Sequence, residues 1–137
     1  MGMRVILPII AGFLILFVGI YLSGQLALYE EFPYLDSLMH LLGGATIAWL
    51  IIAYANSKRP SFRRVIIITL IVGLLWELAE YLSGINLQGT VIYKYFHGGN
   101  RLDTLADLFM DGLGAAGVLI LPSKRSHPFE SLDTKQP

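Results

Sequence analysis

Four long apolar runs constrain the fold of this chain more than any other feature of its sequence. They cover residues 5–22, 37–55, 65–82 and about 104–121. A helix needs about 20 apolar residues to cross the hydrocarbon core of a bilayer, and each run approaches that length. Only 15% of the residues are charged, whereas about a quarter are charged in a typical soluble domain. We therefore predict an all-α fold, a four-helix transmembrane bundle, in a multi-pass protein of the cell (inner) membrane.

The ends of the runs divide the chain into two regions. We expect residues 1–122 to form the four-span membrane domain and residues 123–137 to form a polar cytoplasmic tail. The first run exceeds the apolar stretch of about 7–15 residues found in signal peptides, so we interpret it as a retained span. The segment 84–102 is long for a connection between helices. Its centre, TVIYKYF, fits a short hairpin or a flap over the bundle as well as a plain connector.

The Lys and Arg residues indicate the orientation of the bundle. If both termini lie on one side of the membrane, eight of these residues lie on that side. The other two lie in the connections on the opposite side. The first set is Arg4, Lys58, Arg59, Arg63, Arg64, Lys124, Arg125 and Lys135, and the second is Lys94 and Arg101. Because cytoplasmic loops carry the excess of Lys and Arg, we predict that both termini are cytoplasmic.

Ionisable side chains interrupt three of the four runs at similar depths. With a helical rise of about 1.5 Å per residue, His40 lies roughly 6 Å inside the second run. By the same measure, Glu77 and Glu80 lie about 9 Å and 4 Å from the outer end of the third run. Asp107 and Asp111 lie about 6 Å and 12 Å inside the fourth. A charge at the centre of a membrane helix costs about 2.5–3.5 kcal/mol on insertion scales, so we predict that these groups face one another in the outer half of the bundle.

Glycines accompany the ionisable residues on the same three runs. Small residues let membrane helices approach closely, so we assign these glycines to helix packing. They are Gly43, Gly44, Gly73 and Gly114. Asp36 and Asp103 stand where the second and fourth runs begin, and aspartate is a favoured N-cap there, so we give them a supporting or capping role. The first run holds no ionisable residue, and we expect it to shield the bundle from lipid.

The predicted pocket contains more acid than its surroundings can neutralise. Carboxylates that share one low-dielectric layer either take up protons or bind cations. Lys94 and Arg101 are the only basic residues of the outer connections. We therefore predict a divalent metal ion held by His40, Glu77, Glu80, Asp107 and Asp111. An oxygen-rich set with one nitrogen fits Mg²⁺, Mn²⁺, Zn²⁺ or non-haem iron, and the sequence does not choose among them.

Three motifs carry a resemblance to a known family. They are YLDSLMHLLGG (residues 34–44), LLWELAEYL (74–82) and LDTLADLFMDGLGA (102–115). In this order they resemble the YjdF-like family of small bacterial and archaeal membrane proteins and, more distantly, the VanZ-like proteins. The resemblance covers most of residues 34–117. It implies a polytopic inner-membrane protein and no established reaction.

Three functions are open for this chain. In the first, the metal serves a membrane hydrolase or transferase that acts on a lipid or a lipid-linked phosphate, with catalytic residues not identified. In the second, the protein is not an enzyme, and the cluster is either an ion or proton site of a small transporter or a structural ion site in a homo-oligomer. The apolar inner half of every run argues against a transport route through one chain. A module that binds a lipid or a partner through residues 84–102 is a third alternative. We expect membrane lipid as a partner and no nucleic acid.

Overall fold

Four helices make up the part of the chain that the structure describes. This computed structural model describes residues 3–21, 32, 34–55, 60–86 and 101–121. The helices are α1 (Met3–Ile20), α3 (Tyr34–Tyr54), α4 (Phe62–Asn86) and α5 (Arg101–Ile120). The described residues form no strand, so the all-α prediction is confirmed for them. Most of the segment 84–102 and all of the predicted tail lie outside the described residues.

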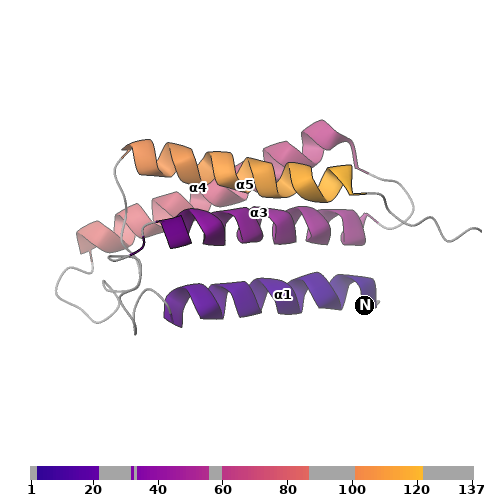
Figure 1. Ribbon diagram of the computed structural model, residues 1–137, viewed down its shortest axis with the longest axis horizontal. Helices are drawn as coiled ribbons and strands as arrows, with labels where there is room; N and C mark the ends of the chain where they lie inside the picture. The colour runs from indigo at the N-terminus through magenta and orange to yellow at the C-terminus, as the bar shows by residue number, and fades with distance from the viewer. Residues whose placement is uncertain (1–2, 22–31, 33, 56–59, 87–100, 122–137) are drawn as a thin grey trace, which may run out of the picture.

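The helices alternate in direction along the bundle (Figure 1). α1 and α4 run one way, and α3 and α5 run the other way. The start of α1 and the end of α5 therefore lie at the same end of the bundle. This arrangement agrees with the prediction that both termini lie on one side of a membrane. The identity of that side as the cytoplasm stays a prediction.

Among the described helices, three are long and apolar enough to cross a membrane. Their spans are Met3–Ile20, Tyr34–Tyr54 and Phe62–Ser83. α5 has a similar length of 20 residues, but it carries Asp103, Asp107 and Asp111. The last two of these side chains are buried inside the bundle, so they do not face the surrounding medium. The fourth span stays a prediction, which the packing of α5 supports.

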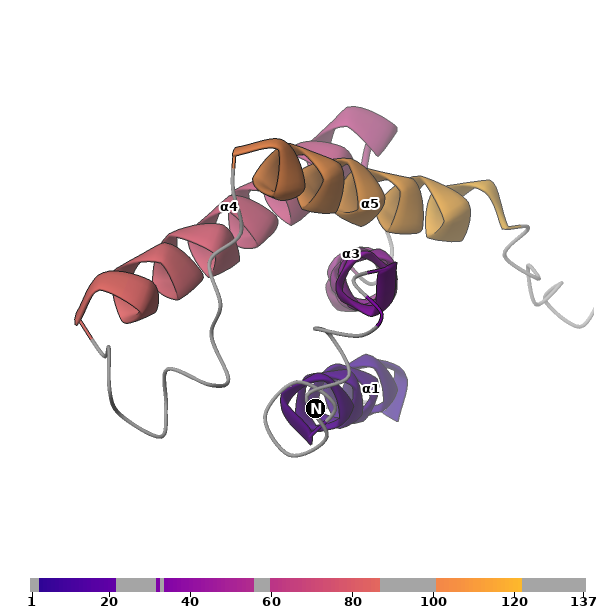
Figure 2. The same ribbon diagram turned by 60° about the vertical axis from the view of Figure 1, so that its left-hand side comes forward.

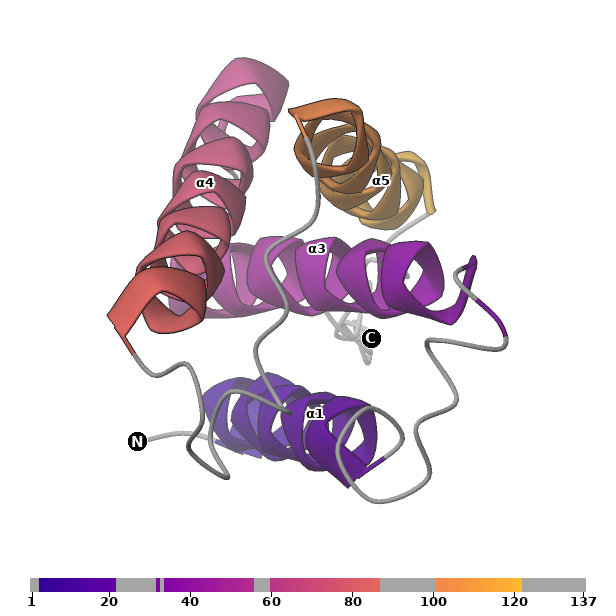
Figure 3. The same cartoon turned by 90° about the vertical axis from the view of Figure 1, so that its left-hand side faces the viewer.

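The helix α3 lies between α1 and the pair formed by α4 and α5 in all three views (Figure 1, Figure 2 and Figure 3). It packs most extensively on α5. A Cβ at Gly44 would overlap the backbone of Asp111, and a Cβ at Gly114 would overlap the carbonyl of Leu41. The two backbones therefore touch where both helices have glycine. Gly43 differs, because a Cβ there would meet no atom within 4 Å and would enter open space.

The helix α1 is the most exposed of the four. It packs on α3, and Pro8 is its one buried residue. Large apolar side chains such as Phe13, Leu14 and Phe17 are exposed. A continuous apolar surface of this kind is unusual on a soluble protein, and a helix that is apolar all round suits a lipid environment.

An apolar core occupies the end of the bundle away from His40. Ala48 of α3, Val65 of α4 and Ala115 of α5 are fully buried there. Partly buried aliphatic side chains pack around them: Ile51, Ile52, Ile66, Val118 and Leu119. The same three helices that form this core continue toward the other end of the bundle, where their buried residues are polar.

Candidate functional site

The buried face of α4 changes from apolar to acidic along its length. Its buried residues are Val65, Thr69, Gly73, Glu77 and Glu80. Steps of three or four residues place all of them on one side of the helix. This face begins in the apolar core and ends in two carboxylates. Because a carboxylate in contact with lipid is costly, both are stabilised by pointing into the bundle.

The neighbouring helices carry matching buried faces. On α3 the buried residues are His40, Gly44 and Ala48, and on α5 they are Asp107, Asp111, Gly114 and Ala115. In each helix the polar residues lie toward one end, a glycine follows, and an alanine lies beyond it. The structure thus brings the five proposed metal ligands to one end of the bundle, and all five are buried.

His40 lies between carboxylates from the two other helices. Its Nε2 atom is 3.5 Å from Oε1 of Glu77 on α4, and its Nδ1 atom is 3.4 Å from Oδ2 of Asp111 on α5. A neutral imidazole carries a hydrogen on only one nitrogen, so both contacts are hydrogen bonds only when the ring is protonated. In that form His40 connects three helices and offsets part of their negative charge.

Uncharged groups donate hydrogen bonds to three further carboxylate oxygens. The donors and acceptors are the Thr104 hydroxyl with Oε2 of Glu77 at 2.7 Å, the Ser37 hydroxyl with Oδ1 of Asp107 at 3.2 Å, and the Trp76 indole N–H with Oε1 of Glu80 at 2.9 Å. Within the described part of the chain, His40 is the one basic side chain paired with these acids. The cluster is therefore rich in acid and poor in positive charge.

One fully buried carboxylate oxygen of the cluster has no hydrogen-bond partner among the residues that the structure describes. This atom is Oε1 of Glu77, whose side chain is 7% exposed. Its contact with His40 is 3.5 Å, longer than the 2.7–2.9 Å of a charge-assisted hydrogen bond. A buried acceptor without a donor carries a desolvation cost of about 1–3 kcal/mol or more. A proton or a cation beside this oxygen would remove that cost.

Gly73 on α4 makes room for the carboxylate of Asp111. A Cβ at Gly73 would overlap Oδ2 of Asp111, the oxygen that contacts His40. The role of this glycine is therefore more specific than close packing of two backbones. It lets a carboxylate from α5 lie against the surface of α4 and still reach the imidazole on α3.

Asp36 belongs to the cluster, although its position at the start of the run predicts a cap. It is the third residue of α3, inside the first turn. Ligand atoms of Asp36, His40 and Asp107 all lie within 4.8 Å of one another. Asp103 occupies the matching place in the first turn of α5 and is exposed. A carboxylate at that place complements the helix dipole, and the supporting role of Asp103 stays a prediction.

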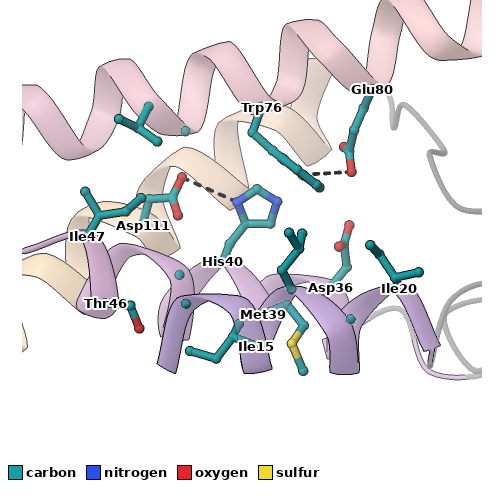
Figure 4. Close-up of a pocket in the computed structure, with 16 residues that line it drawn as sticks. Ile15, Ile20, Asp36, Met39, His40, Thr46, Ile47, Trp76, Glu80 and Asp111 are labelled. Atoms are coloured by element: carbon teal, nitrogen blue, oxygen red, sulfur yellow. Dashed lines mark hydrogen bonds and ion pairs between the residues drawn. The ribbon is translucent and has the colours of Figure 1, made fainter. Parts of the chain in front are cut away.

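A cavity of about 300 Å³ opens beside the cluster, between α1, α3 and α4. Four ionisable residues of the cluster line it: Asp36, His40, Glu80 and Asp111. Figure 4 shows the carboxylates of Asp36 and Glu80 pointing toward one another across the cavity, with the Trp76 ring beside them. Glu77 and Asp107 do not line the cavity. His40 therefore lines the cavity and also contacts Glu77, which does not.

A match over most of the chain identifies its family. A family described as "predicted membrane protein (DUF2238)" matches residues 3–127. The chain belongs to this family. Membership confirms a membrane protein, while the closer likeness to YjdF-like and VanZ-like proteins stays an expectation. No curated protein and no solved structure matches the chain.

Reasoning from the sequence did not find every polar residue of this DUF2238 member's site. Ser37, Thr104 and Trp76 donate to the carboxylates, and two of them had recognisable signals. Trp76 lies four residues before Glu80 on the same helical face. Ser37 lies three residues before His40 and directly follows Asp36. Thr104 had no signal of its own, because its contact with Glu77 depends on how α4 and α5 are placed.

Proposed function

We propose that the cluster binds a divalent cation. The observation that carries this proposal is the buried, acid-rich convergence on His40, in which Oε1 of Glu77 has no hydrogen-bond partner within the described helices. The ligand atoms of Asp36, His40 and Asp107 lie within 4.8 Å of one another. Opposed ligands at 2.0–2.2 Å from a small cation are separated by about 4.4 Å, so small side-chain movements would complete the coordination.

The chemistry of the donors supports a small divalent ion. The proposed ligands are carboxylate oxygens and one imidazole nitrogen, a set that suits Mg²⁺, Mn²⁺, Zn²⁺ or iron. His40 can give one ring nitrogen to the ion while the other keeps its carboxylate contact. A carboxylate on the far nitrogen of a metal-binding histidine fixes the orientation of the ring. Glu77 and Asp111 both lie where this role requires.

We infer that the site faces the outer half of the inner membrane in a multi-pass protein. The arrangement of the helices and the distribution of Lys and Arg support this orientation. A cation in this position would polarise a phosphoryl oxygen or activate water. On this basis we propose hydrolysis or transfer of a lipid or lipid-linked phosphate. The cavity beside the cluster supports a substrate that enters from the membrane.

A second candidate function is a proton or ion site without catalysis. The observation that favours it is the contact of both His40 nitrogens with carboxylates, an arrangement in which a proton can replace a cation. Buried intramembrane carboxylates occur in transporters as well as in enzymes. Beyond the cluster, Thr69 is the one buried polar side chain among the described residues, and the core around Ala48 and Val65 is apolar. A transport role would therefore need an oligomer.

Elemental analysis of the protein purified in neutral detergent tests the proposal. After equilibration with Mg²⁺, Mn²⁺, Zn²⁺ and Fe²⁺ and removal of free metal, we expect about one divalent ion for each chain. Asp107→Asn should lose most of the bound ion. Asp103→Asn is the matched control, because it makes the same change one turn away at an exposed position, and it should keep the ion. A wild-type protein without stoichiometric metal under all four conditions would reject the metal site and leave the proton site.

A further inference from the structure

The cavity between α1, α3 and α4 has two chemically different parts. Its apolar wall includes Ile15 and Leu16 from α1, Ile47 from α3 and Val72 from α4. Its polar end carries the carboxylates of Asp36, Glu80 and Asp111 and the imidazole of His40. All residues that line it belong to the described part of the chain, and no Lys or Arg is among them. A ligand for this cavity therefore needs an apolar body and a polar end that tolerates acid.

The position of the cavity favours entry from the lipid. α1 packs on α3, and no comparable packing joins α1 to α4. The cavity lies between these two helices, which are candidate membrane spans. A molecule dissolved in the bilayer can reach it sideways, while a molecule in water would have to pass the ends of the helices. The volume of about 300 Å³ is at the lower end of ligand pockets, which favours one alkyl chain over a two-chain lipid.

The charge at the polar end selects the head group. Three carboxylates face one imidazole, so the excess charge is negative unless protons are taken up. An anionic head group would meet repulsion there, whereas an ammonium group would be attracted. The indole of Trp76 lines the cavity beside Glu80, and an aromatic face is a further binding surface for an ammonium ion.

We propose that this cavity binds a single-chain amphiphile with an ammonium head group, placed between Asp36 and Glu80 beside Trp76, with its alkyl chain along α1. The proposal goes beyond the divalent-cation site. It shares Asp36 and Glu80 with the proposed cation site, and it needs no metal. Its test is therefore made with a chelator present.

Gly43 provides a direct way to close the cavity. It lines the cavity, and a Cβ there would meet no atom within 4 Å. Gly43→Leu should therefore fill the space without displacing the backbone. Gly117 on α5 is the matched control, because a Cβ there also meets no atom within 4 Å and the residue does not line the cavity. Gly43→Ala is a milder variant for use if the leucine variant does not fold.

The experiment follows the fluorescence of Trp76 in a Trp49→Phe background, in dodecyl maltoside micelles with chelator. Dodecyltrimethylammonium, dodecyl sulfate and dodecyl phosphate are added separately. We expect a saturable change with the ammonium compound and none with the two anions. In Gly43→Leu the half-saturating concentration should rise by roughly tenfold or more, in Glu80→Gln it should rise severalfold, and in Gly117→Leu it should stay unchanged.

Two results would overturn the proposal. One is the same response to all three head groups, or an ammonium response that persists in the Gly43 variants, because either shows partition into the micelle. The other is binding of dodecyl phosphate alone, and only after divalent metal is restored, which would assign the cavity to a lipid phosphate. The elemental analysis, made without chelator, decides the cation site on its own. Ammonium binding together with a failed elemental analysis would reject the cation site and retain this proposal, so the two failures are distinguishable.

Discussion

The two ends of the bundle use the same three helices but hold them together by different interactions. At one end Ala48, Val65 and Ala115 meet in a fully buried apolar core. At the other end His40 contacts Glu77 and Asp111. Within a membrane, apolar packing gains little over lipid contact and depends on close fit. The polar end depends instead on protons or cations that offset its charge, so conditions in solution should affect the two ends differently.

The largest effect is expected between the two ends, where α3 and α5 touch. Gly44→Ala places a methyl group on the backbone of Asp111, which a side-chain rotation cannot relieve. Overpacking of this kind costs about 1–3 kcal/mol and occasionally more. We expect a large fall in the midpoint of thermal unfolding in detergent, followed by circular dichroism, or failure to fold. Gly117→Ala, which adds the same methyl in open space, should leave the midpoint within error. Equal effects of the two changes would contradict the backbone contact.

Removal of divalent cations should destabilise the polar end next most strongly. A cation present at one hundred times its dissociation constant contributes about 2.7 kcal/mol of stability. Protons compete with cations for the carboxylates and the imidazole, so the loss caused by a chelator should grow as the pH rises from 5 to 9. The measurement is the unfolding midpoint with and without chelator across this range. If neither chelator nor added divalent ions change the midpoint at any pH in this range, a bound cation does not stabilise the polar end.

Loss of one ion-pair partner should have a smaller effect. Asp111→Asn keeps the size of the side chain and removes its charge, so the contact with His40 weakens without new overlap at Gly73. We expect a cost of about 1.5–3 kcal/mol, as for a hydrogen bond to a charged group. The cost should shrink when His40 is also replaced, as in Asp111→Asn with His40→Gln. Strictly additive effects in this double-mutant cycle would show that the two residues are not coupled.

The smallest effect is expected in the apolar core. Val65→Ala removes two methyl groups from a fully buried position. Each buried methyl group costs about 0.5–1.5 kcal/mol in a soluble core, and the cost should be lower here because separated membrane helices remain in an apolar medium. Unlike the changes at the polar end, this loss should be the same at every pH and with or without chelator. A pH-dependent cost at Val65 would show that the stability of the apolar core depends on the protonation of the polar end.

The sequence alone was sufficient to predict the helices and to place the polar residues at similar positions along them. The apolar runs have the length of membrane spans, and the helical rise is constant, so counting residues from the ends of the runs gives a common depth for His40, Glu77 and Asp107. This reasoning succeeds because it depends on local geometry only. The positions of the glycines on the same faces follow from the same periodicity.

Features that depend on how the helices are placed could not be predicted. Gly43 and Gly44 are adjacent in sequence, yet Gly44 touches α5 and Gly43 lines the cavity. Only the rotation of α3 against its neighbours separates the two. Asp36 and Asp103 have the same local pattern, and the structure brings only Asp36 close to His40. The cavity itself requires the position of α1, whose sequence carries no polar signal.

The overlap between Gly73 and the carboxylate of Asp111 implies a dependence between two positions 38 residues apart. The carboxylate of Asp111 on α5 occupies the space that a side chain at position 73 on α4 would need. An added methyl at position 73 would be tolerated only with a shorter residue at position 111, and that exchange would also take an acid away from His40. The two positions should therefore covary among related sequences, and a change at either one alone should be rare.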